Sequence, residues 1–386
     1  MERIYLDYNA STPLKEEVIR AMEPFIYDHF GNPSASHWAA NKASSSLEQA
    51  RHQVAQSIGA QTEEVIFTSG GSEANNFALK GVFQSLRDRG NHIITSKVEH
   101  PAVMNPCDYL EKQGAQVTYL EVDEFGQVDP EDVENAVTDE TILISIMHAN
   151  NEVGTLQPIS EITAIAKKNG IVMHTDASQS IGKVPIDVDQ LQIDLLTVAG
   201  HKVYAPKGIG ALYIRQGTPI EPLIHGAGHE MGMRAGTENV MLAVGLGEAC
   251  SSSTSTSSFH QIEEIRQLRD KFWERLHRLL HGQLTLNGHP DERLANTLSV
   301  NFPGFTGEEV LRQIPEVAAS TGSACHSGNV QLSSVLKAMG VEEHVGKGAV
   351  RFSLGHYTTE KDIDRVIDLL EERVLQRKYQ DLKMND

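Results

Sequence analysis

Three residues that could do chemistry, Lys202, Asp176 and His100, each follow a short apolar run typical of a buried β-strand. The carboxyl ends of parallel strands meet at one edge of a sheet, and ligands of α/β proteins bind outside that edge. A single lysine is more often solvated, and an isolated histidine is more often a surface or core residue. Because all three strand ends are expected at the same edge of the sheet, we interpret the three residues together as a candidate site.

A fourth strand end supplies a candidate anion site. The run 65–68 leads into Ser-Gly-Gly-Ser-Glu at 69–73, and the residues that follow have a helical pattern. Gly71 allows close backbone approach, and the free N–H groups of a first helical turn can bind an anion together with the Ser72 hydroxyl. A glycine turn with Ser72 as the helix N-cap is the competing interpretation.

An anion site, an acid and a lysine at one sheet edge match the cofactor pyridoxal 5'-phosphate. The phosphate would lie at the helix N-terminus, Asp176 would face the pyridinium nitrogen, and Lys202 would form a Schiff base with the aldehyde. Asp176 would keep the ring nitrogen protonated, which makes the ring an electron sink. It could instead cap the next helix. A dinucleotide is disfavoured because the first turn lacks Gly-x-Gly-x-x-Gly.

One of the three cysteines differs from the other two in its surroundings. Cys325 lies in Ser-Thr-Gly-Ser-Ala-Cys-His-Ser-Gly at 320–328, whose small residues suit an exposed mobile loop. With His326 beside it, Cys325 is expected to be a reactive thiol. Cys107 and Cys250 are expected to be inert, buried hydrophobic residues.

Two further segments carry polar groups that could bind a substrate. Arg351 stands in an apolar strand context, where a guanidinium needs a partner. A bidentate clamp on a substrate carboxylate would supply one, and a structural ion pair is the alternative. Asn150 and Asn151 are adjacent carboxamides before a glycine, and they could form no more than a turn.

The alternation of strand-like and helix-like patterns predicts an α/β fold. Amphipathic stretches such as 72–86 and 159–168 separate the strand candidates, several of which are apolar on both faces. This pattern is typical of a parallel sheet covered by helices on each side. The candidate strands are Val65–Thr68, His92–Ser96, Gln116–Val122, Thr141–Met147, Gly170–Thr175, Leu195–Val198 and Gly210–Ile214.

The last third of the chain predicts a second compact region. A serine-rich run at 251–258 is interpreted as a linker, with a helix junction as the alternative. Apolar residues at three- and four-residue intervals over 262–279 predict a long amphipathic helix. Strands are then expected at 297–301 and 349–354, and a closing helix at 360–377.

Composition excludes several classes of function. The chain has 386 residues, 40% hydrophobic and 22% charged, which is typical of a globular protein. Lys plus Arg number 33 against 52 Asp plus Glu, a net charge of −19, which argues against nucleic acid or an anionic membrane as partner. The cysteine spacing fits neither a disulfide framework nor a metal site. Because no signal sequence or run of ~18 apolar residues is present, we expect a cytoplasmic protein.

These residues stand in motifs whose order resembles the cysteine desulfurase and selenocysteine lyase family of the aminotransferase class V proteins. No single motif is decisive, but their joint order and spacing is specific and covers nearly the whole chain. The motifs are Tyr-Leu-Asp-Tyr-Asn-Ala at 5–10, Gly-Asn-Pro-Ser at 31–34, Phe-Thr-Ser-Gly-Gly-Ser-Glu at 67–73, Glu-His at 99–100, Asn-Asn-Glu-Val-Gly at 150–154, His-Thr-Asp-Ala at 174–177, Gly-His-Lys at 200–202, Arg-Ala-Gly-Thr-Glu-Asn at 234–239, Ser-Ala-Cys at 323–325 and Arg-Phe-Ser-Leu-Gly at 351–355.

The resemblance implies a fold and an assembly. The fold would be the aspartate-aminotransferase type, pyridoxal-phosphate fold type I, with a mostly parallel seven-stranded sheet. A large domain would span residues 15–258, and a smaller α+β domain would combine residues 1–14 with 259–386. The protein would be a homodimer in which Thr237 reaches the phosphate bound by the other subunit.

The resemblance also assigns roles to individual residues. Lys202 would carry the cofactor and move the substrate α-proton, and His100 would stack on the ring and shuttle protons. Asn151 and Arg351 would hold the substrate carboxylate. The residues that would bind the cofactor are Gly71, Ser72 and His201 at the phosphate, Asp176 at the pyridinium, Gln179 at the ring oxygen, and His100, Lys202 and Thr237.

The implied reaction is conversion of L-cysteine to L-alanine. The Cys325 thiolate would attack the substrate sulfur and keep it as a persulfide, and its loop would then deliver the sulfur to an acceptor protein for iron–sulfur cluster or thio-cofactor assembly. A lyase acting on L-selenocysteine is the alternative within the fold. A non-catalytic scaffold for sulfur-acceptor proteins is disfavoured, because such a module has no use for Lys202, Asp176, His100 and Cys325 together.

Two positions depart from the family pattern. Ala199 stands where the family often has a serine that bonds the phosphate, so retention of the cofactor would be weaker unless another donor compensates. Cys325 is followed by His-Ser, as in selenocysteine lyases, whereas many desulfurases have threonine after the cysteine. The length of the loop up to Gly340 is nevertheless typical of desulfurases, so the preference between cysteine and selenocysteine stays open.

Overall fold

The computed structural model of the protein describes residues 3–280, 282–326 and 329–375. Its main sheet has seven strands in the order β2-β8-β7-β6-β5-β3-β4, and β8 is the antiparallel member, pairing that way with both neighbours. The mostly parallel seven-stranded sheet of an α/β protein is therefore confirmed. The strands are β2 (Val65–Thr68), β3 (His92–Ser96), β4 (Gln116–Leu120), β5 (Thr141–Ser145), β6 (Val172–Asp176), β7 (Leu195–Ala199) and β8 (Gly210–Ile214).

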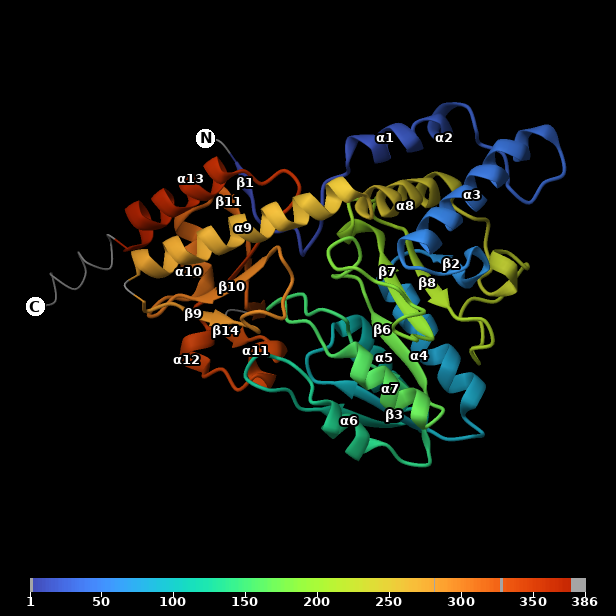
Figure 1. The fold of residues 1–386 in the computed structure, drawn as a ribbon, viewed down its shortest axis with the longest axis horizontal. Helices are drawn as coiled ribbons and strands as arrows, with labels where there is room; N and C mark the ends of the chain where they lie inside the picture. Colours follow the sequence, from blue (N-terminus) through green and yellow to red (C-terminus); the bar gives the residue numbers. More distant parts are fainter. Residues whose placement is uncertain (1–2, 281, 327–328, 376–386) are drawn as a thin grey trace, which may run out of the picture.

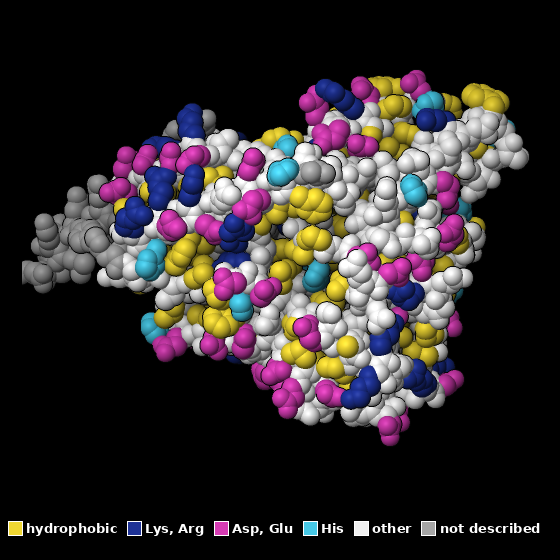
Figure 2. Space-filling view, in the orientation of Figure 1, with side chains coloured by type: hydrophobic (Ala, Val, Ile, Leu, Met, Phe, Trp, Pro, Cys, Tyr) yellow, Lys and Arg dark blue, Asp and Glu magenta, His cyan; other side chains and the backbone are white. Residues whose placement is uncertain are grey.

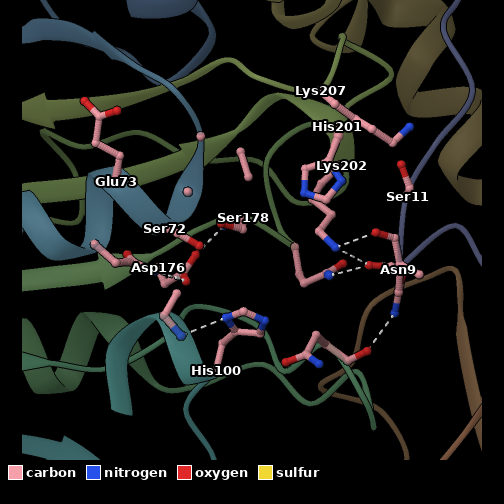
Figure 3. Close-up of a pocket in the computed structure, with 18 of the residues that line it drawn as sticks. Asn9, Ser11, Ser72, Glu73, His100, Asp176, Ser178, His201, Lys202 and Lys207 are labelled. Carbon is pink, nitrogen blue, oxygen red and sulfur yellow. Dashed lines mark hydrogen bonds between the residues drawn. The ribbon is translucent and has the colours of Figure 1, made fainter. Parts of the chain in front are cut away.

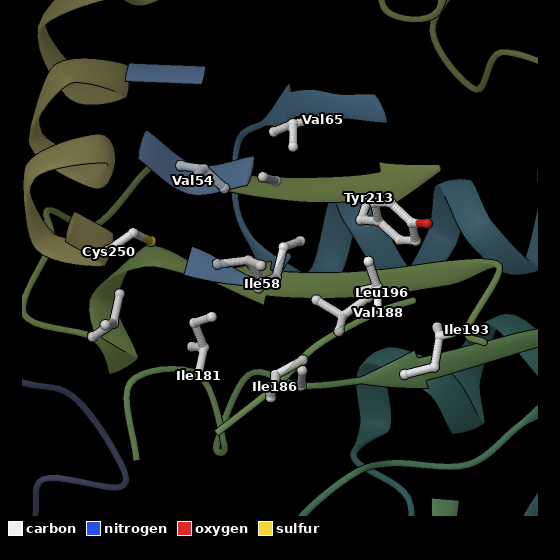
Figure 4. Packing of buried hydrophobic residues seen from close by; sticks show 14 of the residues in the cluster. Val54, Ile58, Val65, Ile181, Ile186, Val188, Ile193, Leu196, Tyr213 and Cys250 are labelled. Atoms are coloured by element: carbon white, nitrogen blue, oxygen red, sulfur yellow. The ribbon is translucent and has the colours of Figure 1, made fainter. Parts of the chain in front are cut away.

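Helices cover both faces of this sheet (Figure 1). All residues of β3, β5, β6 and β7 are buried, which explains why their sequences are apolar on both faces. Helices α3, α7 and α8 pack into one cluster with the strands, and α4 and α5 pack into another. Figure 4 shows part of the first cluster, which includes Val54 of α3, Cys250 of α8 and Leu196 of β7.

The helices of this part of the chain follow the periodic segments, and 72–86 and 159–168 are helical as predicted. Turns and short 3-10 helices separate them from the strands. The helices are α1 (Glu16–Met22), α2 (Pro24–Tyr27), α3 (Trp38–Ser57), α4 (Gly71–Leu86), α5 (Pro101–Glu111), α6 (Pro130–Ala136), α7 (Ile159–Lys168) and α8 (Val240–Ser253), and the 3-10 helices are η1 (Thr62–Glu64), η2 (Gly200–Lys202) and η3 (Glu230–Gly232).

The rest of the chain forms a smaller α+β unit around the four-stranded sheet β12-β15-β10-β9. The N-terminal strand β1 joins this unit by pairing in parallel with β11, and Asp7 bridges to Ser353 at the end of β15. The elements are β1 (Ile4–Tyr5), α9 (Thr256–Leu279), β9 (Thr285–Asn287), β10 (Thr297–Asn301), α10 (Gly307–Gln313), β11 (Val317–Ala318), β12 (Ser320–Thr321), β13 (Ser323–His326), β14 (Asn329–Leu332), α11 (Ser334–Ala338), α12 (Glu343–Gly346), β15 (Ala349–Ser353), α13 (Glu360–Leu370) and the π-helical turn η4 (Glu371–Leu375).

The linker predicted at the serine run is wrong, and the alternative of a helix junction is correct. Residues 251–253 end α8, and α9 begins at Thr256. Ser253 donates its hydroxyl to the Cys250 carbonyl at 2.8 Å, and Ser255 caps α9 by accepting from the Ser258 N–H at 3.2 Å. Serine hydroxyls can bond to nearby backbone groups, so the composition alone did not distinguish a cap from a linker.

The division of the chain at residues 14/15 and 258/259 stays a prediction. Two large clusters of buried side chains support it, because one runs from Val18 to Cys250 and the other combines Ile4 and Leu6 with residues 272–374.

Acidic side chains are spread over the visible face rather than gathered in one patch (Figure 2). Within the described ranges, no helix is both long and apolar enough to cross a membrane.

Candidate functional site

A cavity of about 650 Å³ lies at the carboxyl edge of the main sheet and is also walled by the N-terminal segment and β15 (Figure 3). The cavity therefore lies at the sheet edge where the strand ends predicted a site. Among the predicted site residues, those that line it are Gly71, Ser72, His100, Asn151, Asp176, Gln179, His201, Lys202 and Arg351. Lining residues that the sequence reasoning did not assign include Asn9, Ser11, Asn75, Ser178 and Lys207.

One wall of the cavity is the N-terminus of α4. Gly70 has a φ of +148°, and Thr68 steadies the turn by donating its hydroxyl to the Gly70 carbonyl at 3.1 Å. A side chain at Gly71 would come within 3.1 Å of both Ala199 Cβ and Ser178 Oγ, so only glycine fits without displacement. The free N–H groups of the first turn and the Ser72 hydroxyl make this wall suitable for an anion.

The Asp176 carboxylate is fixed at the end of β6. It is buried, its Oδ2 accepts from Asn75 Nδ2 at 2.7 Å, and its Oδ1 accepts from the Ser178 N–H at 2.9 Å. Both bonds fix the orientation of the carboxylate, which can accept a hydrogen bond from a protonated ring nitrogen. Asn75 is thus a residue of the site that sequence reasoning missed, because its helical position carries no signal of its own.

Lys202 lies in η2, directly after β7, and points toward the N-terminal segment (Figure 3). Its Nζ donates to the Asn9 carbonyl at 2.6 Å and to the Ala10 carbonyl at 2.9 Å. Burial, with repulsion from Arg351, lowers the pKa of Lys202 to about 8. At pH 7 a pKa of about 8 leaves roughly a tenth of the amine unprotonated, far more than in an ordinary lysine, and the unprotonated amine is the nucleophilic form.

The two histidines of the cavity are both held in the neutral form. His100 is the N-cap of α5, where its Nδ1 accepts from the Ala102 N–H at 3.0 Å, and burial lowers its pKa. Burial, together with Lys202 and Lys207, lowers the pKa of His201 to about 4. An imidazole whose Nδ1 accepts carries its proton on Nε2, so His100 can donate from that atom.

Arg351 has the structural ion pair that the sequence left as an alternative. Its Nη2 donates to Asp7 Oδ1 at 2.8 Å and to Ser320 Oγ at 3.0 Å, and its Nη1 donates to the Asn151 carbonyl at 2.8 Å. The buried Nε has no partner among the described residues. Arg351 is therefore fixed in place and still lines the cavity, so the ion pair and a carboxylate-binding role are compatible.

Two predicted site residues are not among those that line the cavity. Thr237 is exposed on the loop before α8, and this loop is tied to α4 by the Arg234–Glu73 ion pair at 2.9 Å. Cys325 belongs to β13, where its register partner is Val330 in a hairpin with β14. Its side chain lies outside the described part of the structure. Cys107 and Cys250 are buried as expected, and burial raises the pKa of each to about 12.

Asn9 was missed although it stands in a motif of the sequence. Its carbonyl accepts from Gln179 Nε2 at 2.9 Å as well as from Lys202, and its own Nδ2 donates to Thr297 Oγ1 at 2.8 Å. Residue 9 reaches the site only through the fold, because the N-terminal segment passes between the sheet edge and β15.

Comparison with known proteins gives a consistent result over nearly the full length. The model of the family described as "Aminotransferase class-V" matches residues 4–366. The protein named cysteine desulfurase IscS from Dictyoglomus turgidum is 47% identical over 376 residues, covering 97% of this chain and 95% of that relative. A solved NifS-like protein has a TM-score of 0.90 and 37% identity, covering 96% of this chain and 98% of its own. The structure titled SspA in complex with cysteine has a TM-score of 0.80 and 41% identity, covering 92% and 100%.

Proposed function

The chain belongs to the aminotransferase class-V family, and from this premise we propose that it is a pyridoxal-phosphate-dependent cysteine desulfurase. The observation that carries the proposal is a single cavity that combines the Lys202 amine, the Asp176 carboxylate and the N-terminus of α4. Relatives named cysteine desulfurase and a solved relative titled as a complex with cysteine support L-cysteine as the substrate.

The residues of the cavity fit pyridoxal 5'-phosphate. The α4 N-terminus with Gly71, Ser72 and His201 would hold the phosphate, because the N–H groups of a first helical turn have no acceptor within their own helix. Asp176 would hold the ring nitrogen in its protonated form, and Gln179 would donate to the ring oxygen. When bound, this cofactor supplies an electron sink for negative charge at the substrate α-carbon.

The chain's own groups would bind the amino acid and move its protons. Arg351 would attract the substrate carboxylate from a fixed position, and Asn151 lies beside it. Lys202, with a pKa lowered to about 8, would accept the α-proton. His100, neutral with its proton on Nε2, would stack on the ring and pass protons.

Cys325 would take the sulfur. Its thiolate would attack the sulfur of cysteine, so that a sulfur–sulfur bond forms as the bond between substrate sulfur and Cβ breaks. Protonation of the carbon product gives L-alanine, and Cys325 is left as a persulfide. The two buried cysteines are poor alternatives, because burial keeps them protonated. The persulfide would then pass to an acceptor protein for iron–sulfur cluster or thio-cofactor assembly.

A homodimer is part of the proposal. Hydrophobic side chains are exposed between α2 and the start of α3, with Tyr27 at 73% and both Phe30 and Trp38 at 83%; Figure 2 shows hydrophobic side chains at this end of the molecule. Exposed apolar groups of this size favour a protein interface. Thr237 would reach the phosphate bound by the second subunit.

The proposed location is the cytoplasm, a reducing compartment that suits a free thiol at Cys325.

Steady-state kinetics on L-cysteine and L-selenocysteine, with detection of persulfide on the protein, tests the proposal. Wild type is expected to release alanine from cysteine and to carry persulfide on Cys325. Cys325→Ala should abolish alanine release from cysteine, and Cys107→Ala, a buried control, should retain it. Undiminished desulfuration by Cys325→Ala would refute the nucleophile assignment. Turnover of selenocysteine alone would favour the lyase, and failure of wild type to bind the cofactor would exclude both.

A further inference from the structure

Lys183 lies one turn beyond Gln179 in the tight segment that follows β6. The Ile181 N–H donates to the Ala177 carbonyl at 2.9 Å, and the Lys183 N–H donates to the Ser180 carbonyl at 2.9 Å. These turns bring the two side chains to the same side of the segment, where Lys183 Nζ donates to Gln179 Oε1 at 3.1 Å. A half-buried lysine therefore contacts a residue of the cavity without being one of the residues that line it.

The two contacts of the Gln179 amide define its orientation. The side chain is 4% exposed, its Oε1 faces the Lys183 amine, and its Nε2 donates to the Asn9 carbonyl at 2.9 Å. A carbonyl only accepts, so a flipped amide would lose its bond to Asn9, and it would also lose the bond to Lys183 whenever that amine is charged, because an ammonium group only donates. Among the described residues, Asn9 is the one acceptor for Nε2, which leaves a second N–H available to a ligand in the cavity.

Lys183 also stands at the end of a hydrogen-bonded chain that leads to Lys202. The Asn9 carbonyl accepts from Gln179 Nε2 and from Lys202 Nζ, so Lys183, Gln179 and Lys202 are linked through that one carbonyl. Both lysines also line a second cavity of about 40 Å³. Burial, with repulsion from Lys202, lowers the pKa of Lys183 to about 7, and both the charged and the neutral amine retain N–H donors.

We propose that Lys183 is a positioning residue that fixes the Gln179 amide so that its nitrogen, rather than its oxygen, faces the cofactor pocket. The inference rests on the proposed function, in which Gln179 donates to the ring oxygen of pyridoxal phosphate. Lys183 acts through Gln179 and does not touch the cofactor itself. Without Lys183, Gln179 Oε1 would lose this donor while it stays buried. The free-energy cost of an unpaired buried acceptor would then favour other orientations of the amide.

The test is binding of pyridoxal phosphate to cofactor-free protein, with the visible absorption band of the bound cofactor followed as pH is changed. Lys183→Met should weaken binding by about fivefold, the effect of one lost hydrogen bond. It should also raise the pH midpoint of the band, because the ring oxygen holds its proton more tightly when the N–H donor is lost. Lys183→Arg keeps a donor and should restore both quantities. Lys168→Met, an exposed lysine paired with Glu134, is the control for loss of a surface charge.

A double-mutant cycle with Gln179→Leu separates positioning from charge and from structural damage. If Lys183 acts through Gln179, Lys183→Met should change neither affinity nor midpoint in the Gln179→Leu background. Equal effects of Lys183→Met in both backgrounds, or no effect in wild type, would overturn the inference. If Lys183→Met does not fold, the same comparison is made with Lys183→Gln. Failure of wild type to bind the cofactor would instead count against the proposed function.

Discussion

Replacing Arg51 by methionine should destabilise the protein and loosen the loop that leads to Thr237. Arg51, in α3, donates from Nη1 and Nη2 to the two oxygens of Glu230 at 2.6 and 3.0 Å, and both side chains are almost fully buried. Glu230 also accepts from the Phe67 N–H at 2.8 Å. The ion pair thus holds η3 against β2, next to the turn at 69–72 that is proposed to bind the phosphate.

The expected loss is about 3–5 kcal/mol, because methionine would leave the Glu230 carboxylate buried without its partner. Methionine retains most of the volume of the arginine stem, so a cavity adds little. Glu230 and Met231 have φ values of +46° and +56°, left-handed conformations that cost roughly 1–2 kcal/mol each in residues other than glycine. The ion pair helps to hold these two conformations, so its loss should destabilise the conformation of the whole loop.

Urea unfolding at one fixed protein concentration measures the effect. Arg51→Met should lower the free energy of unfolding far more than Arg20→Met, which removes an exposed pair with Glu16 worth no more than about 0.5 kcal/mol. The double variant Arg51→Met with Glu230→Leu should recover part of the loss, because no buried charge remains although the Phe67 N–H loses its acceptor. A loss for Arg51→Met no larger than that for Arg20→Met would refute the reasoning.

Three further predictions concern Glu99, which accepts from the N–H of the lining residue Met147, and two residues of the cavity itself. Burial raises the pKa of Glu99 to about 8, so the native state holds a proton that the unfolded state releases above 4.5, and wild-type stability should fall as pH rises over that window. Glu99→Gln should remove that slope, and parallel stability curves for the two proteins would contradict this. Asn75→Leu removes the donor to Asp176 and should weaken binding of pyridoxal phosphate by about tenfold, since the lost bond is to a charged group; unchanged affinity in a binding titration would exclude the role. Ser178→Ala should weaken binding of pyridoxal phosphate but not of unphosphorylated pyridoxal, and Ala199→Ser in the same protein should restore it, because both positions flank Gly71; a missing rescue would show that the two hydroxyls do not serve one phosphate.

The sheet and the position of its cavity could be predicted from local patterns. Strands such as β3 and β5 are buried on both faces, so every residue in them is constrained to be apolar or paired, and the sequence shows it. The chemical groups then follow at strand ends, where the chain leaves the sheet at a common edge. Lys202 and Asp176 could be found in this way because each is adjacent in sequence to the strand that positions it.

Contacts between distant segments could not be predicted in the same way. The Asp7–Arg351 ion pair joins residues 344 positions apart, and each residue alone is compatible with solvent or with a substrate. The serine run could not be predicted although its hydrogen bonds are local. The same hydroxyls that suit a linker also bond to the backbone at the ends of α8 and α9. Local composition limits the roles that a residue can have. The residue that it contacts in the folded protein determines which of those roles it has.

The N-terminal segment determines how the two sides of the cavity are aligned. Asp7 holds Arg351, which belongs to the smaller sheet, and the carbonyls of Asn9 and Ala10 hold Lys202, which belongs to the edge of the large sheet. These contacts all lie within residues 7–10, so the distance between guanidinium and amine is limited by the length of one short stretch of chain. The segment is itself tied to the smaller unit by pairing of β1 with β11. A shift of that unit against the large sheet would therefore change the position of Arg351 and the hydrogen bonds of Lys202 together, which would couple the roles proposed for these two residues.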